Sequence, residues 1–578
     1  MLKYTTMPVW RRIRERLEFL YADRAERCLE RMGMLIGRYG VGFNDQPPLK
    51  YRDQADSILI TYGDMISDGE TSPLETLEKF LSDELRGAVT TVHLLPFFPY
   101  SSDDGFSVLD YRTVDPALGK WKHIDRFNKN FSLMFDLVLN HVSRGSEWFR
   151  QYARGIAPER RYFIEMDPSM DLSQTIRPRS SPLLSETWTR NGLRHLWTTF
   201  SEDQMDLDFS NPDVLFEFLD ILLLYISHGA RIIRLDAIAY LWKKPGTSCI
   251  HLPETHVIVK LFRDFIELLG VDVALLTETN VPQEENTSYF GNGDEAHLVY
   301  QFPLPPLLLQ ALVAGDSGHL TRWAAGLQPP PAGCRFVNFT ASHDGIGVRP
   351  LEGLIRPPEM QALLDHVRAA GGQIAFKRNA DGSESPYELN ITYFDALDTP
   401  DRPNENLQVE RFLCSQAVML ALKGIPAVYF NSLIGGRNWA EGVQQTGRAR
   451  TINRQKWTRH KLAEKLGKPD DAPARIFRRY RALLLLRAKH PAFHPDGAQE
   501  TADLGQKVFT IVRTAPDKSE TVTSISNFTD KTLVLNPAAV IPALANSAEW
   551  HDLISGKNRR SPAGLELKPY ETCWIRTV

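Results

Sequence analysis

The chain has 578 residues, of which 43% are hydrophobic and 24% are charged, and its net charge is −4. This composition is typical of a globular protein, and the length allows one large domain with appendages or several ordinary domains. No run of lysine or arginine forms a basic tail, so we expect no nucleic-acid partner. No segment approaches the roughly 20 apolar residues of a membrane span, so we expect no membrane partner.

The five cysteines are odd in number, widely separated and without C-x-x-C spacing. This pattern predicts neither a disulfide framework nor a zinc site, and we expect most of these thiols to be buried in a reducing compartment. Residues 1–40 are charged and amphipathic, unlike a signal peptide, so we expect a cytoplasmic protein. We expect this stretch to pack as a helix on the main domain, in preference to a membrane surface.

Eight short apolar stretches predict strands that are buried on both faces. They cover residues 57–62, 89–96, 131–141, 231–237, 273–279, 296–302, 336–340 and 427–430. Helical patterns separate many of them, as at 73–85, 214–227, 257–269 and 409–423. This alternation predicts an α/β protein with a closed (β/α)₈ TIM barrel. A doubly wound open sheet is the alternative, which is disfavoured because no G-x-G-x-x-G motif follows the first strand.

The pattern also predicts how the chain is divided into domains. Residues 1–50 form an N-terminal helical extension that ends in a proline-rich link at 46–50. The barrel takes 51–142 and 206–495, and a small inserted domain at 143–205 separates its third and fourth strands. A second long segment, about 345–405, follows the seventh strand, and such long excursions are usually functional. Short strands with turns predict a C-terminal all-β domain at 496–578.

The fourth predicted strand carries Arg234 and Asp236, which point to the same side because side chains alternate along a strand. The arginine would keep this carboxylate ionised, although a purely structural ion pair fits the same two residues. Other predicted strand ends also carry acidic or histidine residues, and in a barrel these ends meet at one face. They are Asp103, Asp136, His141, Glu278, His343 and Asp344.

Several carboxylates in one pocket shift one another's pKa values, so one holds a proton while another stays ionised. Glycosyl transfer requires this combination, with one carboxylate as nucleophile and one carboxylic acid as proton donor. A metal site is the rival interpretation of the same carboxylates. Arg234 argues against it, because a guanidinium at that position repels a divalent cation.

Four motifs resemble, in order, the four sequence regions of the α-amylase family, glycoside hydrolase family 13. They are Asp136-x-x-x-Asn140-His141, Arg234-Leu-Asp236-Ala, Glu278 within Leu-Leu-Thr-Glu-Thr-Asn, and His343-Asp344. The resemblance implies a (β/α)₈ barrel with a small domain after the third strand and a C-terminal β domain. It implies that Asp236 is the nucleophile, Glu278 the acid/base and Asp344 the transition-state stabiliser. It also implies that Arg234, His141 and His343 line the glucosyl subsite, and we expect no metal.

Finer motifs are similar to the sucrose phosphorylase branch of this family, among them Leu95-Pro-Phe-Phe-Pro, Arg177-Pro-Arg179 and Ile452-Asn-Arg454. This resemblance implies that Asp103 and Arg454 hold the region of the glucosyl 4-OH and that Phe106 packs on the sugar face. Arg179 and Tyr240 match positions that bind phosphate. A retaining enzyme forms a covalent glucosyl ester, here on Asp236, which either water or phosphate then attacks.

The acceptor side departs from sucrose phosphorylase. Asn280 stands where that enzyme has a histidine, and Glu388, next to Tyr387, aligns with an acceptor-loop glutamine. These differences look more like the glucosylglycerate phosphorylases, in which Arg177 or Arg179 would meet the glycerate carboxylate. Glu388 fits such an acceptor only if it turns away or pairs with an arginine.

The resulting prediction is a retaining phosphorylase for a small α-glucoside, with phosphate as co-substrate and no cofactor, acting as a monomer or homodimer. A sucrose phosphorylase, a hydrolase or transglucosylase, and a catalytically inactive sugar-binding barrel are the alternatives.

Overall fold

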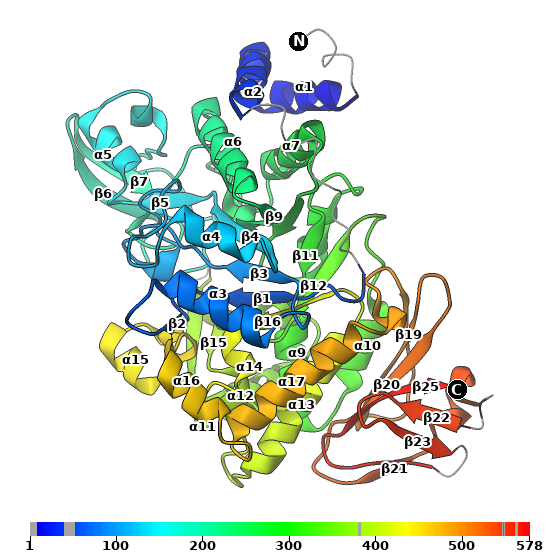
Figure 1. Cartoon of the computed structure of the whole chain (residues 1–578). Helices are drawn as coiled ribbons and strands as arrows, with labels where there is room; N and C mark the ends of the chain where they lie inside the picture. Colours follow the sequence, from blue (N-terminus) through cyan, green and yellow to red (C-terminus); the bar gives the residue numbers. More distant parts are fainter. Residues whose placement is uncertain are drawn as a thin grey trace.

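The computed structural model describes residues 8–39, 53–179, 181–379, 383–545, 547, 549–560 and 564–577, and the predicted link at 46–50 lies outside them. All eight predicted barrel strands form, and they close into a parallel barrel in the order β1, β3, β4, β9, β10, β11, β12, β16 (Figure 1). Their bounds are Ile58–Thr61, Thr91–Leu94, Ser132–Val138, Ala230–Asp236, Ala274–Thr277, Leu298–Tyr300, Arg335–Phe339 and Ile425–Tyr429. The (β/α)₈ prediction is therefore confirmed, and the open-sheet alternative is wrong.

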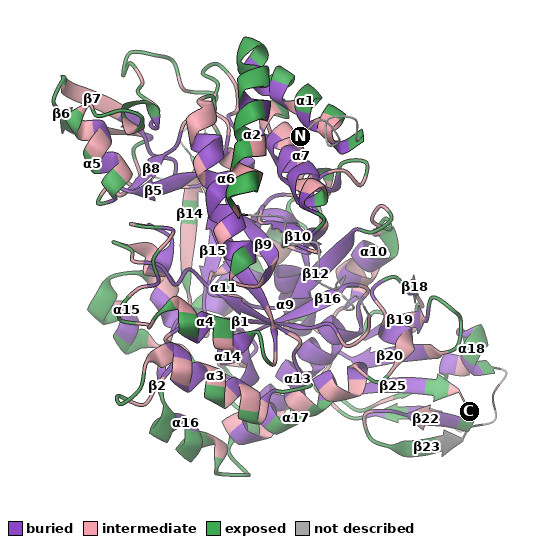
Figure 2. Ribbon diagram, turned by 45° about the horizontal axis from the view of Figure 1, so that its top comes forward, coloured by how far each residue is buried: buried purple, intermediate pink, exposed green. Residues whose placement is uncertain are grey.

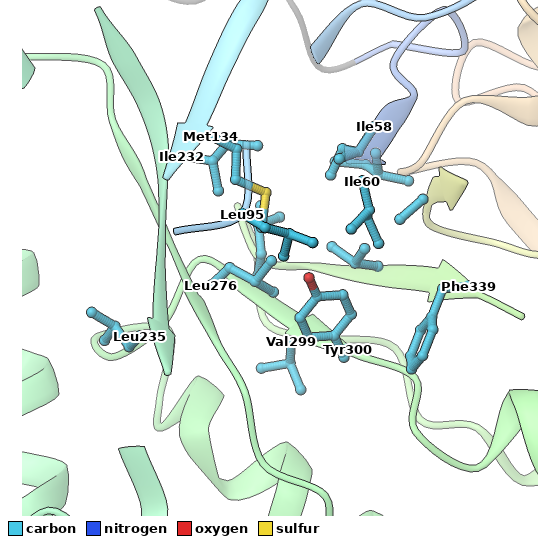
Figure 3. Packing of buried hydrophobic residues seen from close by; sticks show 14 of the residues in the cluster. Ile58, Ile60, Leu95, Met134, Ile232, Leu235, Leu276, Val299, Tyr300 and Phe339 are labelled. Carbon is cyan, nitrogen blue, oxygen red and sulfur yellow. The ribbon is translucent and has the colours of Figure 1, made fainter. Parts of the chain in front are cut away.

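The barrel interior is packed with side chains. Figure 3 shows Ile60, Met134, Leu276 and Tyr300 gathered inside it, whereas Leu235 lies apart from this group. These residues are all buried, because helices cover the outer face of the strands. Burial on both faces explains why each strand is a continuous apolar run.

The predicted helices also form, within a few residues of their expected ends. They are α3 (Pro73–Glu84), α6 (Pro212–Ser227), α7 (Pro253–Leu269) and α13 (Glu405–Ala421). The sequence fixes two of their starts, because the Ser72 hydroxyl accepts from the amide of Glu75 and the Asn211 side chain accepts from the amide of Asp213. Figure 2 shows their buried sides facing the barrel.

Two excursions rise from the C-terminal ends of the strands. Between β4 and α6, strand β5 (His141–Ser143) pairs antiparallel with β8 (Gln204–Asp206), and the segment between them holds α5 (Glu147–Arg154) and the hairpin of β6 (Leu184–Thr189) and β7 (Gly192–Trp197). After β12, a small sheet forms in the order β13, β15, β14. Its strands are Ile346–Gly347, Glu384–Asn390 and Gln373–Arg378.

The C-terminal part forms a sheet in the order β18, β19, β20, β25, β22, β23. Its strands are Ala498–Thr501, Val508–Thr514, Thr521–Asn527, Thr572–Thr577, Glu549–Asp552 and Lys557–Arg560. The buried Arg513 ties this sheet to the barrel, because its Nη1 donates to the carbonyl of Ala421 at 2.8 Å.

Two helices precede the barrel, α1 (Pro8–Tyr21) and α2 (Ala25–Tyr39). Helix α1 packs against α7 and α2 packs against α6, as Figure 1 shows at the top of the molecule. Ile13, Leu17 and Met32 are fully buried there. None of the helices in the described ranges is long and apolar enough to cross a membrane. All five cysteines are free thiols and buried.

Candidate active site

A pocket opens at the C-terminal ends of the barrel strands, and it brings together most of the residues that the sequence predicts for the site. Those that line it are Asp103, Phe106, His141, Arg179, Arg234, Asp236, Tyr240, Glu278, Asn280, His343, Asp344, Tyr387 and Glu388. Arg454 is buried behind the wall. Arg177 is not among the residues that line the pocket, although Arg179, two positions later, is.

Arg234 anchors the floor of the pocket. Its Nη1 donates to Asp136 Oδ1 at 2.5 Å and to Asp236 Oδ1 at 2.7 Å. Asp136 faces Arg234 in the β4–β9 register, and its other oxygen lies 2.7 Å from His93 Nε2. The predicted proximity of Arg234 and Asp236 is therefore present, within a larger buried network.

Asp236 and Glu278 form the carboxylate pair. Burial raises the pKa of Asp236, with Glu278 adding to the rise and Arg234 opposing it. Burial also raises the pKa of Glu278, with Arg234 again opposing and Asp344 adding. Two carboxylates so close together disfavour simultaneous ionisation, which favours a proton on one of them. Arg234 donates directly to Asp236 and so favours the anionic form of that carboxyl.

Asp344 stays ionised beside this pair. Burial alone would raise its pKa, but Arg450, His343, Arg454 and Arg234 lower it far below the ordinary aspartate value. Arg450 Nη1 lies 2.5 Å from Asp344 Oδ1. Burial lowers the pKa of His343 to about 3, so this imidazole is neutral at physiological pH. The site therefore holds an ionised Asp344 beside two carboxyls whose pKa values are raised.

An aromatic and basic wall completes the glucosyl side. The ring of Phe106 stacks on His343 with centroids 4.8 Å apart. Arg454 Nη1 lies 2.6 Å from Asp104 Oδ2 and 3.7 Å from Asp103 Oδ1, so its shorter contact is with the neighbour of the predicted partner. Arg454 Nε also donates to the carbonyl of His343 at 2.9 Å, which supports the loop that carries Asp344.

His141 is held by the β5–β8 ribbon. Its Nε2 lies 3.0 Å from the carbonyl of Phe106 and 3.1 Å from Gln204 Nε2. Beneath it the buried Lys243 Nζ lies 2.6 Å from Asp206 Oδ2 and donates to Asn140 Oδ1 at 2.5 Å. This buried ammonium cross-links β8 to the end of β4 and so fixes the ribbon over the pocket.

Four of the residues that are predicted to bind phosphate or the acceptor line the pocket together: Arg179, Tyr240, Asn280 and Tyr387. The guanidinium of Arg179 lies 5.9 Å from the ring centroid of Tyr387, and it has no carboxylate partner among the residues that the structure describes. The side chain of Asn280 lies close to the backbone of Gly347. A Cβ atom added at Gly347 would stand 2.4 Å from the Asn280 side chain. Its buried Oδ1 accepts no hydrogen bond within the described part of the chain.

The carboxylate of Glu388 is paired and so is not free to meet an acceptor. Its Oε1 accepts from Arg450 Nε at 2.9 Å, and its Oε2 accepts from Arg450 Nη2 at 2.5 Å. The sequence allowed Glu388 either to turn away from an acceptor or to pair with an arginine. The structure shows the pairing with an arginine.

Sequence reasoning missed Arg450, Lys243, Gln204 and His93. The first two are single basic residues outside the predicted strands and helices, and only their buried carboxylate partners, Glu388 and Asp206, show their importance. Arg450 lies four residues before Arg454, and both guanidinium groups reach Asp344. This spacing could have drawn attention to Arg450. Among the described residues, no cluster of three or more His, Cys, Asp or Glu side chains has the arrangement of a metal site.

Comparison with known proteins agrees with this geometry. The family model described as "Alpha amylase, catalytic domain" matches residues 84–321. The chain is 43% identical to a glucosylglycerate phosphorylase of Spirochaeta thermophila over 98% of both chains. It is 32% identical to a sucrose phosphorylase of Agrobacterium vitis, over 78% of this chain and 91% of that protein. The crystal structure of sucrose 6F-phosphate phosphorylase from Thermoanaerobacter thermosaccharolyticum superposes with a TM-score of 0.72 at 26% identity, covering 82% of this chain and 94% of that one.

The fold and the carboxylate site together define a glycosyl-transferring (β/α)₈ enzyme. The chain belongs to the α-amylase family, glycoside hydrolase family 13. Within that family it is an enzyme of the glycoside phosphorylase type, in the branch that includes the glucosylglycerate and sucrose phosphorylases.

Proposed function

We propose that this chain catalyses the reversible phosphorolysis of 2-O-α-glucosylglycerate, which yields α-D-glucose 1-phosphate and glycerate. The observation that carries the choice of acceptor is the 43% identity to a glucosylglycerate phosphorylase along 98% of both chains. The similarity to a sucrose phosphorylase is lower, 32%, and covers 78% of this chain. Phosphate enters as a co-substrate, and no bound cofactor is part of the proposal.

In the first step, Asp236 attacks the anomeric carbon while Glu278 donates its proton to the glycosidic oxygen. The carbon–oxygen bond breaks, glycerate leaves, and a β-glucosyl ester forms on Asp236. Arg234 keeps the attacking carboxylate anionic through its 2.7 Å contact with Oδ1. Asp344 stabilises the positive charge that develops on the sugar ring and accepts hydrogen bonds from its hydroxyls.

In the second step, a phosphate oxygen attacks the anomeric carbon of the ester and displaces Asp236 as a free carboxylate. Two inversions give net retention, so the product is α-D-glucose 1-phosphate. Glu278, now deprotonated, accepts the proton of the attacking phosphate. We assign Arg179 and Tyr240 to phosphate, because a guanidinium and a phenol supply the donors that a phosphate requires.

Arg179 would bind the glycerate carboxylate and the phosphate in turn. Glycerate leaves before phosphate arrives, so one acceptor-side cation can bind the carboxylate first and the phosphate second. Arg234 and Arg450 already pair with carboxylates, whereas Arg179 has no carboxylate partner among the described residues. Glu388 does not repel either anion strongly, because Arg450 neutralises its charge.

The test is a panel of acceptors incubated with α-D-glucose 1-phosphate, with phosphate release as the readout. The panel contains D-glycerate, D-fructose, fructose 6-phosphate, glycerol and a water blank. We expect glycerate to give the highest kcat/KM. Fructose as the best acceptor would favour a sucrose phosphorylase, and equal release in the water blank would favour a hydrolase; either result would refute the proposal.

A further inference from the structure

Arg450 occupies the junction between the glucosyl and acceptor halves of the pocket. Its Nη1 lies 2.5 Å from Asp344 Oδ1, on the glucosyl side. Its Nε and Nη2 donate to the two oxygens of Glu388, on the acceptor side, at 2.9 and 2.5 Å. One guanidinium therefore joins a carboxylate of each half.

Glu388 is fixed by its surroundings. It is 2% exposed and lies on β15, which pairs with β13 immediately after Asp344. A Cβ atom at Gly345 would stand 2.5 Å from Glu388 Cγ, so the side chain is packed directly against that backbone. With both oxygens engaged by Arg450, the carboxylate is turned toward the arginine and away from an acceptor.

The segment that carries Arg450 is also tied to Asp344. Asn453, three residues later, donates to the carbonyl of Ser342 at 2.6 Å and to the carbonyl of Asp344 at 3.2 Å. The backbone around Asp344 is thus held by Asn453, and its side chain is contacted by Arg450. Among the groups that lower the pKa of Asp344 against the effect of burial, Arg450 is the strongest.

We propose that Glu388 is a positioning residue whose carboxylate aims Arg450 at Asp344, so that Glu388 acts on glucosyl transfer and not on recognition of the acceptor. This inference rests on the proposed function, and it changes the role of a side chain that alignment places with the acceptor. A carboxylate is required because only its two oxygens match the parallel N–H groups of the guanidinium fork.

Glu388→Gln tests this with α-D-glucosyl fluoride as donor, because fluoride leaves without any glycerate group in the pocket. The amide would present an NH₂ group to Arg450 and break one arm of the fork. We expect kcat for fluoride release to fall by about tenfold or more, the effect of losing a charge-assisted contact at the transition state. We also expect the acid limb of its pH profile to move to higher pH, since Asp344 loses part of its support.

The matched control is Glu352→Gln. It removes a carboxylate from the same excursion, where Glu352 lies 3.7 Å from Lys377 and is 53% exposed. We expect fluoride release by this variant to stay within about twofold of the wild type, as for surface substitutions in general. Arg450→Lys is the second test variant, because lysine keeps the charge and loses the fork, and we expect it to reproduce the lower rate and the shifted acid limb.

A wild-type rate of fluoride release by folded Glu388→Gln would overturn the inference. So would a change confined to the KM for glycerate. Should Glu388→Gln fold poorly, as judged by its thermal midpoint, Glu388→Asp replaces it, because the shorter side chain keeps the charge but draws the carboxylate back from Arg450, and the same lower rate is expected. Acceptor identity is read separately from phosphate release by the wild type with glycerate, so failure of the proposed function leaves the fluoride comparison valid.

Discussion

Asp236 and Glu278 are chemically similar, but one neighbour gives them different surroundings. Arg234 lies 2.7 Å from Asp236 Oδ1, whereas Glu278 Oε2 accepts, among the described residues, only from the backbone amide of Ala237, at 3.0 Å. A guanidinium stabilises a carboxylate more strongly than a neutral amide does. Arg234 therefore favours the anionic form more at Asp236 than at Glu278, as the proposed roles of nucleophile and acid require.

The proposed roles of nucleophile and acid can be tested separately with α-D-glucosyl fluoride, a donor whose leaving group needs no proton. We expect Glu278→Ala to lose phosphorolysis of glucosylglycerate while retaining fluoride release from α-D-glucosyl fluoride, because fluoride departs without a proton. We expect Asp236→Ala to lose both activities by roughly 10⁴-fold or more, as when a covalent nucleophile is removed. Steady-state rates with the two donors measure this. Equal losses in both variants with both donors would contradict the assignment.

Arg179 contacts no carboxylate among the described residues, so its charge is available to an anionic ligand. We expect Arg179→Gln to raise the KM for phosphate and for glycerate by about 10- to 100-fold, the range for one lost hydrogen-bonded charge. Hydrolysis of the glucosyl enzyme by water should fall much less, because water needs no cation. Initial rates with varied phosphate, and glucose release without phosphate, provide the measurement. An unchanged KM for both anions would show that another group binds them.

At the scale of elements, the β13–β15 sheet brings Asp344 and Glu388 together although they are far apart in the sequence. The pairing of Gly347 with Glu388 sets this register. The close approach depends on Gly345, where a Cβ atom would stand 2.7 Å from the carbonyl oxygen of Leu389. The same Cβ atom would stand 2.5 Å from Glu388 Cγ, and that side chain is held by Arg450, so neither neighbour can move away easily.

Gly345→Ala should therefore displace β13 from β15. We expect it to lower stability by about 1–3 kcal/mol, as overpacking does, and to reduce kcat by moving Asp344 and Arg450 apart. Gly326→Ala is the control, because a Cβ atom there has nothing within 4 Å, and it should be neutral or stabilising by up to about 1 kcal/mol. Thermal unfolding and phosphate release are measured for both. Similar behaviour of the two variants would mean that β13 does not constrain the site.

The strands and the carboxylates could be predicted because each depends on local sequence. A strand buried on both faces is a short apolar run, and the motifs around Asp236, Glu278 and Asp344 follow such runs directly. The Arg450–Glu388 pair could not be predicted, because it depends on the β13–β15 register and on a short 3-10 helix (Ala449–Asn453) 62 residues further along. The contact of Arg454 with Asp104 likewise depends on side-chain packing, since Asp103 and Asp104 are adjacent.

At the scale of the whole molecule, additions to both ends of the chain support the barrel from outside. The C-terminal sheet is tied to α13 and β12 by Arg513, which donates to Ala421, and by Arg335, whose Nη2 lies 2.5 Å from Asp496. On the opposite side α1 and α2 cover α6 and α7 (Figure 1). Tyr21 also donates to the carbonyl of Phe209, between the β5–β8 ribbon and α6. The N-terminal helices thereby support the chain that leads out of the excursion over the pocket.

Arg12 is the main polar link between α1 and the barrel, and its removal tests this support. Its Nε donates to Asp264 Oδ1 at 2.7 Å, and its Nη2 donates to Glu267 Oε2 at 2.6 Å. Burial raises the pKa of Asp264 even though Arg12 and Arg16 oppose the rise. Arg12→Met should raise this pKa further, because one of the opposing cations is lost. We expect a loss of about 1–3 kcal/mol at pH 7.5, since the buried carboxylate keeps its charge with fewer partners.

The sign of the pH dependence follows from proton binding. An unfolded aspartate titrates near about 3.9, so between that value and the raised folded pKa the folded chain binds more protons than the unfolded chain. Stability therefore falls as pH rises through this window, and the deficit of Arg12→Met should be larger at pH 7.5 than at pH 5. Arg14→Met is the control, because Arg14 pairs on the surface with Glu26, and exposed pairs contribute about 1 kcal/mol or less. Thermal midpoints of the wild type and both variants at the two pH values decide the matter: a deficit in Arg12→Met that does not grow with pH would exclude Asp264 as its cause.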